Sequence, residues 1–107
     1  MAIASTPATP YYAVIFTSLR TENDQGYSEM SDAMVASAAR QPGFLGMESA
    51  REEVGITVSY WASLEAISAW KQHAAHLAAQ KTGRDTWYAA FKVRICLVER
   101  DYALAPR

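Results

Sequence analysis

Two histidines and two tryptophans lie within one short stretch of this 107-residue chain, SYWASLEAISAWKQHAAHLAAQ, residues 59–80. Trp70, His73 and His76 follow one another at intervals of three residues. Histidine exchanges a proton near neutral pH more readily than any other side chain, which suits the deprotonation of a phenol. His73 is therefore the candidate base or oxygen partner of a pocket. A solvated surface position is the alternative, and it is the one we favour for His76.

A metal site is the second chemistry that two histidines on one helix suggest. His73 and His76 provide two ligands, and no Asp, Glu or Cys lies close by on the helix to complete the three or four that a metal site needs. We therefore expect no metal. The one cysteine, Cys96, excludes an internal disulfide and is expected to be a small buried side chain, as in a reducing cytoplasm.

Length and charge exclude several other classes of protein. The chain is one small domain, and its 10 basic and 11 acidic residues give a net charge of −1, without the basic surplus of a nucleic-acid binder. No apolar run approaches the roughly 18 residues of a membrane span. The first residues, MAIASTPATP, lack the basic and apolar parts of a secretory signal. We expect a cytoplasmic protein that binds neither nucleic acid nor a membrane.

The elements that must position these side chains follow from the spacing of apolar residues. β-branched and aromatic runs predict strands, and apolar spacings of three and four predict helices, the second with Ser63 as its N-cap. The expected strands are 11–19, 44–51, 56–61 and 88–102, and the expected helices are 26–40 and 63–83. In the last strand, Phe91, Val93, Ile95 and Leu97 face one way, and Lys92, Arg94, Cys96 and Val98 the other.

The order βαββαβ predicts an α+β, ferredoxin-like sandwich: a four-stranded antiparallel sheet with two helices on one face. Residues 11–103 form this single domain, between a flexible tail at 1–10 and a short tail at 104–107. The first and third strands carry apolar residues on both faces, so the face without helices also needs cover. We therefore predict a homodimer whose two sheets stack face to face.

Several large side chains have two possible roles. Trp70 lies on the core-facing stripe of its helix, as a core anchor or as the wall of a pocket. Tyr60 and Trp61 are neighbours on a strand, so one faces the helices and the other faces away, and the sequence leaves open which. Trp87 and Tyr88 raise the same question. Four further residues have a structural alternative: core packing for Met30 and Met34, a helix C-terminal charge for Arg84, and an ion pair with Glu48 or Glu99 for Arg94.

Four segments carry a resemblance to a known family: AVIFTS, QPGFLGMES, SYWASLEAISAWKQHAAHLAAQ and GRDTWYAAFKVRICLVERDY. Together they make the chain, over about residues 11–102, resemble the antibiotic biosynthesis monooxygenase family of the dimeric α+β barrel superfamily. The resemblance implies the fold and the dimer just described. For chemistry it implies less, because the family contains quinol-type monooxygenases, haem-degrading enzymes and members without an assigned reaction.

The leading implication is a cofactor-independent monooxygenase that uses molecular oxygen on a small aromatic, phenolic or quinol-type substrate. Its alternatives are a non-catalytic small-molecule-binding dimer and a haem-binding or haem-degrading protein. The haem branch needs an Asn on the first strand and a His ten residues after Trp70. This chain has no Asn on that strand, and residue 80 is Gln, so haem is disfavoured. The implied catalytic residues are His73, Trp70 and Tyr60, and the implied substrate-binding residues are Met30, Met34, Phe16, Trp61, His76, Arg84 and Tyr88.

Overall fold

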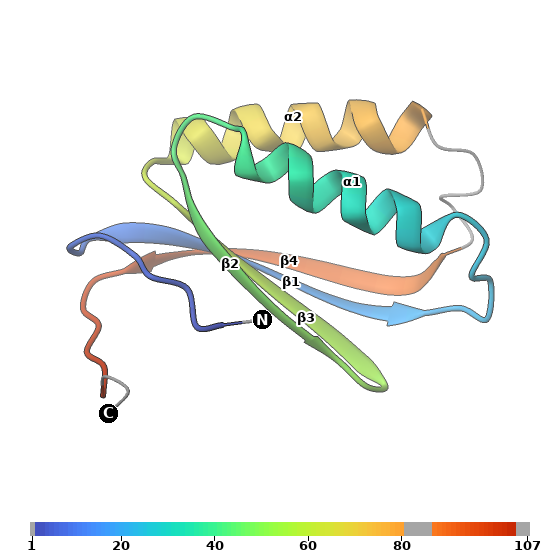
Figure 1. Ribbon diagram of the computed structural model, residues 1–107, viewed down its shortest axis with the longest axis horizontal. Coiled ribbons are helices and arrows are strands. Elements are labelled where there is room, and N and C mark those ends of the chain that lie inside the picture. Colours follow the sequence, from blue (N-terminus) through green and yellow to red (C-terminus); the bar gives the residue numbers. More distant parts are fainter. Residues whose placement is uncertain (1, 81–86, 105–107) are drawn as a thin grey trace.

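The computed structural model describes residues 2–80 and 87–104, apart from the side chains of residues 77–80. These residues form a layer of two helices on one face of a four-stranded sheet (Figure 1). The predicted element order is confirmed. In chain order the elements are β1 (Tyr11–Arg20), α1 (Tyr27–Ala39), β2 (Phe44–Arg51), β3 (Val54–Trp61), α2 (Leu64–Gln80) and β4 (Tyr88–Val98).

The sheet has the strand order β2-β3-β1-β4, and each neighbouring pair is antiparallel. This arrangement confirms the predicted ferredoxin-like α+β fold. Two strand ends differ from the sequence prediction by more than one residue. β3 begins at Val54, because Val54 still pairs with Leu19 of β1. β4 ends at Val98, because its partner Tyr11 is the first residue of β1 and follows Pro10, which has no N–H to donate.

Two connections fix the helices against the sheet. Ser63 caps α2 as predicted, since its Oγ accepts a hydrogen bond of 3.1 Å from the N–H of Ala66. Gly43, just before β2, has a φ of +85°, and a Cβ there would lie only 2.7 Å from the Cβ of Ala66. Its carbonyl accepts a hydrogen bond of 2.8 Å from Ala62. A glycine is therefore required where the start of β2 touches the start of α2.

The strand register decides which side chains face the helices. Trp61 of β3 is fully buried and stacks on Trp70 of α2, with ring centroids 6.0 Å apart, so it lies on the helix-covered face. Residues directly opposite each other on paired strands share a face. Tyr12 and Leu97 are therefore on the same face as Trp61, which we call the helix side. Phe91, Val93 and Ile95 alternate with Leu97 and lie there too, as the sequence predicted for this set.

The opposite face of the sheet carries no helix, and we call it the open face. Tyr11, Ala13 and Ile15 of β1 lie on it, beside Tyr60 and Val58 of β3. The chain before β1 also contacts this face. None of the helices in the described parts of the chain has the length and apolar character needed to cross a membrane.

Candidate functional site

A row of apolar side chains on β4 is exposed on the helix side of the sheet. The row consists of Phe91, Val93, Ile95 and Leu97, whose exposed fractions are 62, 47, 52 and 48%. We call these four residues the helix-side row. Side chains on the covered face of a sheet are normally buried, so solvent reaches the sheet beside the helices here. An exposed apolar strip of this kind is typical of a surface that binds a ligand or a partner.

One end of the helix-side row is closed by a cluster of aromatic rings. Phe16 of β1 stacks on Phe91 at 5.4 Å and meets Tyr88 edge to face at 5.5 Å. Tyr88 meets the ring of Tyr27, the first residue of α1, at 5.9 Å, and its hydroxyl lies 3.5 Å from the Tyr27 hydroxyl. Burial, and then this hydrogen bond, raise the pKa of Tyr88. Its hydroxyl therefore stays protonated and donates its hydrogen bond to Tyr27.

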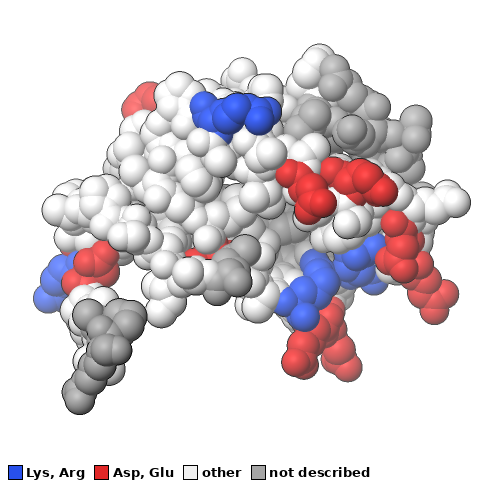
Figure 2. Space-filling view, viewed as in Figure 1, with Lys and Arg blue, Asp and Glu red and all other residues white. Residues whose placement is uncertain are grey.

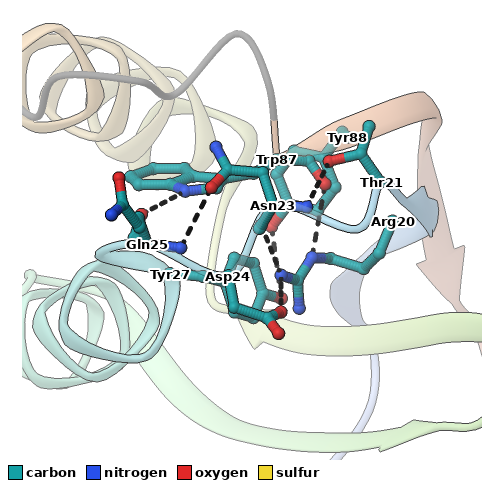
Figure 3. A network of polar contacts seen from close by, with 8 residues as sticks. All are labelled: Arg20, Thr21, Asn23, Asp24, Gln25, Tyr27, Trp87 and Tyr88. Atoms are coloured by element: carbon teal, nitrogen blue, oxygen red, sulfur yellow. Dashed lines mark hydrogen bonds and ion pairs between the residues drawn. The ribbon is translucent and has the colours of Figure 1, made fainter.

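The loop between β1 and α1 is tied to the start of β4 by a polar network (Figure 3). The guanidinium of Arg20 lies 3.4 Å from the centroid of the Tyr27 ring and is paired with Asp24 at 2.8 Å. It also donates hydrogen bonds to the carbonyls of Trp87 and Asn23. The buried Trp87 donates its indole N–H to the carbonyl of Gln25 at 2.7 Å. This network holds Tyr27 and Tyr88 together.

A second arginine reaches the same end of the sheet from β2, the edge strand opposite β4. Arg51, the last residue of β2, donates a hydrogen bond from Nη2 to the Oγ of Ser18 on β1. Its guanidinium crosses Gly55 of β3, where any Cβ would overlap it. The positive charges of Arg51 and Arg20 both act on Tyr88, where they oppose the rise of its pKa. The aromatic end therefore has cations beside it.

The residues predicted for the site lie in two groups, Trp70 with His73 near Trp61, and Phe16 with Tyr88 at the aromatic end. Trp70 lies over Trp61, whose indole N–H donates to Ser59 at 2.9 Å, and His73 is exposed with its ring 6.0 Å from that of Trp70. His76 is exposed one turn further along α2. On α1, Met30 is buried and Met34 is partly buried. Phe16 and Tyr88 form the aromatic end.

Tyr60 lies apart from the other predicted residues. It points to the open face, where its hydroxyl donates a hydrogen bond of 2.7 Å to Glu48, so it shares no pocket with Trp70 and His73. Burial, and then the carboxylate of Glu48, raise the pKa of Tyr60 to about 12. Arg94 is exposed on the open face, opposite Ile15, rather than buried with a partner. The predicted anion contact Arg84 lies outside the described residues.

Sequence reasoning missed Arg51, Arg20 and the pairing of Tyr27 with Tyr88. None of these groups forms a motif, because they come from separate elements that meet only in the folded sheet. A weak signal exists for Arg51, since a strand ending in Arg and a glycine four residues later, across a hairpin turn, can place the two side by side. Across residues 2–80 and 87–104, no three His, Cys, Asp or Glu side chains gather closely enough to hold a metal ion.

Comparisons with known proteins agree on one group of relatives. A protein-family model described as "Antibiotic biosynthesis monooxygenase" matches residues 10–82. The uncharacterized protein YqjZ of Bacillus subtilis strain 168 is 53% identical over 101 residues, which are 92% of this chain and 89% of YqjZ.

Solved structures of other proteins share the fold. A variant of MhuD with two manganese protoporphyrin IX molecules bound per active site has a TM-score of 0.66 and 25% identity, over 86% of this chain and 98% of that one. A variant of SnoaB, a cofactor-independent oxygenase from Streptomyces nogalater, has a TM-score of 0.64 and 14% identity, over 90% and 98%.

Proposed function

Because the chain belongs to the antibiotic biosynthesis monooxygenase family, we propose that it is a monooxygenase that binds a small phenolic or quinol-type molecule between its helices and sheet. Molecular oxygen is the co-substrate, and no cofactor takes part. The observation that carries this proposal is the helix-side row, which leaves apolar surface open beside the aromatic end. A flat aromatic ring matches that surface in shape and polarity.

The reaction needs little from the protein once the substrate is deprotonated. A phenolate is electron-rich enough to pass an electron to oxygen without a cofactor. In the overall reaction, one oxygen atom enters the ring at a C–H carbon. The second oxygen atom leaves as water with the two hydrogens lost from that carbon and from the phenol hydroxyl. The products of a simple phenol are therefore a quinone and water, and no other reductant is consumed.

The chain's own groups favour the phenolate in three ways. Apolar side chains of the helix-side row remove water from the ring face that lies on them. The hydroxyl of Tyr88 donates to the hydroxyl of Tyr27, whose own proton can then be donated to the substrate oxygen. The nearby positive charge of Arg51 lowers the pKa of a phenol bound beside it. His73, next to Trp70 on α2, is the proposed proton acceptor, and Met34 and Phe16 are proposed lining residues.

The open face gives the proposal its second part, a homodimer formed through the sheets. Ile15 and Val58 lie centrally on this face and are only partly covered by the chain itself, while Val54 and Ile56 are 45% exposed. A second copy of the same face would remove these apolar side chains from water. A cytoplasmic location, expected from the lone cysteine, belongs to the same proposal.

Haem binding is the second candidate, because MhuD binds a metalloporphyrin and is 25% identical to this chain. A porphyrin ring would fit the helix-side row, and its carboxylates would fit Arg51. The chain fits haem poorly at the axial ligand of the iron. Within the described side chains the histidines are His73 and His76, and both are exposed on α2. Gln80 stands where the haem-degrading branch requires a histidine. We therefore derive no step through haem.

Oxygen uptake by purified, metal-free protein tests the proposal against a panel of hydroquinones and polyphenols. We expect protein-dependent uptake that falls about a hundredfold in His73→Ala, as for loss of a general base, and that also falls in Trp70→Phe. Tyr11→Phe, on the open face, is the matched aromatic control and should keep the wild-type rate. Compounds that bind without uptake would instead establish the non-catalytic dimer, and a Soret band with a stoichiometric haem titration would establish the haem protein.

A further inference from the structure

We propose that Arg51 selects substrates that carry a carboxylate next to the aromatic ring. The inference rests on the proposed function, because it assumes that the ring lies on the helix-side row. It goes beyond that function by naming the class of substrate, an aromatic acid, and a residue that recognises it.

The position of Arg51 relative to the row follows from the strand register. Arg51 is opposite Gly55, Gly55 is opposite Ser18, and Ser18 is opposite Phe91. These four residues form one line across the sheet on the helix side. The guanidinium crosses Gly55 and bonds Ser18, and Ser18 is one strand spacing, about 4.8 Å, from Phe91 on the neighbouring strand. A ring stacked near Phe91 would therefore present a substituent to Arg51.

The two arginines at this end, Arg20 and Arg51, differ in the number of hydrogen-bond partners that they already have. Arg20 donates to two carbonyls and to Asp24, and it covers the Tyr27 ring, so its role is to hold the loop. Arg51 is exposed and donates only to the buried Ser18, and the part of the chain that the structure describes gives it no carboxylate partner. Figure 2 shows basic side chains gathered near the β2–β3 hairpin, with acidic side chains around them. Of these two arginines, Arg51 is thus the one with N–H donors left for a ligand.

A guanidinium recognises a carboxylate through two parallel N–H···O bonds, which a neutral substituent cannot accept with the same strength. The hydrogen bond to Ser18 fixes the orientation of the group before a ligand arrives, which reduces the entropy lost on binding. The site therefore favours a flat aromatic ring over Phe91 and Val93 with an acid group directed toward Ser18.

Gly55 makes it possible to separate the position of Arg51 from its charge. The backbone of Gly55 lies outside the positive-φ region, so an alanine fits its conformation, but the added Cβ would overlap the guanidinium. Gly55→Ala should therefore push Arg51 away from Ser18 while the charge stays on the chain. Arg51→Gln removes the charge directly.

The test compares two probes that share a ring, 2,5-dihydroxybenzoate and methylhydroquinone, by anaerobic titration of tryptophan fluorescence. We expect the wild type to bind the acid more tightly. Arg51→Gln should weaken binding of the acid about tenfold and leave the neutral probe unchanged. Gly55→Ala should act in the same direction, and the double variant should lose no more than Arg51→Gln alone. Arg94→Gln, which removes a positive charge from the open face, is the matched control and should have no effect.

Each contrary result has a distinct meaning. Equal binding of both probes by the wild type, or an acid preference that survives in Arg51→Gln, overturns the inference and leaves the monooxygenase proposal intact. An equal loss in Arg94→Gln also overturns it, because the preference would then come from overall charge. If neither probe binds nor supports oxygen uptake, the proposed function fails, and the inference fails with it.

Discussion

The two faces of the sheet are both apolar, but different parts of the chain cover them. On the helix side, β4 remains about half exposed although two helices pack on that face. On the open face, Tyr11 and Ala13 are buried although no helix lies there. The N-terminal segment explains part of this, since the N–H of Ala4 donates to Glu48, and Thr6 bonds the hydroxyl of Tyr11.

This difference shows that the presence of a helix layer does not by itself identify the buried face. Where the helices touch the sheet, at Trp61 and Trp70, the core is closed. Away from that contact, the side chains of β4 stay accessible, and that is where we place a ligand. The open face instead combines apolar residues with two polar ties, Tyr60 to Glu48 and Tyr11 to Asp101, which suits a surface that can meet a second protein.

The largest expected effect separates two neighbours on β3 that point to opposite faces. Trp61→Ala should lower the free energy of unfolding by about 3–5 kcal/mol, because it empties a fully buried site beneath Trp70. Tyr60→Phe removes one hydrogen bond and should cost about 1 kcal/mol. Urea denaturation of both variants measures the contrast. Equal losses would show that the open face contributes as much to the core as the helix side.

A crossed pair of substitutions tests the separate roles of the faces. Ile56→Glu and Val93→Glu each place a carboxylate at a side chain of nearly equal exposure, 45 and 47%. Ile56→Glu should weaken the dimer at least about tenfold by burying charge between the sheets, and Val93→Glu should weaken binding of aromatic ligands by a similar factor. Sedimentation equilibrium and fluorescence titration measure the two effects. Each variant is the control for the other, and an exchange of effects would contradict both assignments.

The smallest effect concerns alkaline pH and Tyr60 on the open face. The pKa of Tyr60 rises from 10.0 to about 12 on folding, so folding favours its protonated form. The stability that it contributes is complete below pH 10 and is lost as the pH rises toward 12, because the unfolded chain then gives up the proton first. Tyr60→Phe should therefore reduce the fall in urea midpoint over this interval. Part of the fall in urea midpoint should remain in this variant, because the pKa of Tyr88 is also raised. An unchanged slope in the variant would refute the assignment.

The sequence predicts the fold well because each element has a local signal. Ser63 precedes a helix-forming run, and the alternation in β4 sorts Phe91 and Val93 from Lys92 and Arg94 without any knowledge of the other strands. The site is predicted less well because it depends on long-range register. Whether Tyr60 or Trp61 faces α2 is decided by the pairing of β3 with β1, which local spacing does not contain.

Arg51 is a site residue that the sequence did not predict, again because its role depends on long-range register. Its role depends on a glycine across a hairpin, a serine on a third strand and an aromatic ring on a fourth. The sequence instead indicated Arg84 and Arg94 as the cations of the site. The register places Arg94 on the open face. Residues that act together across a sheet become visible only when all four strands are in place.

The segment before β1 has a practical consequence for handling the protein. Ala4 packs so closely against β2 that a Cβ at Gly46 would lie 2.9 Å from the Cβ of Ala4, and the hydroxyl of Tyr11 bonds Asp101 beyond β4. Both ends of the described chain therefore lie beside the open face (Figure 1). A purification tag fused to either end would project into the surface proposed for self-association. Molar-mass measurements that test the proposed dimer should thus be made on tag-free protein.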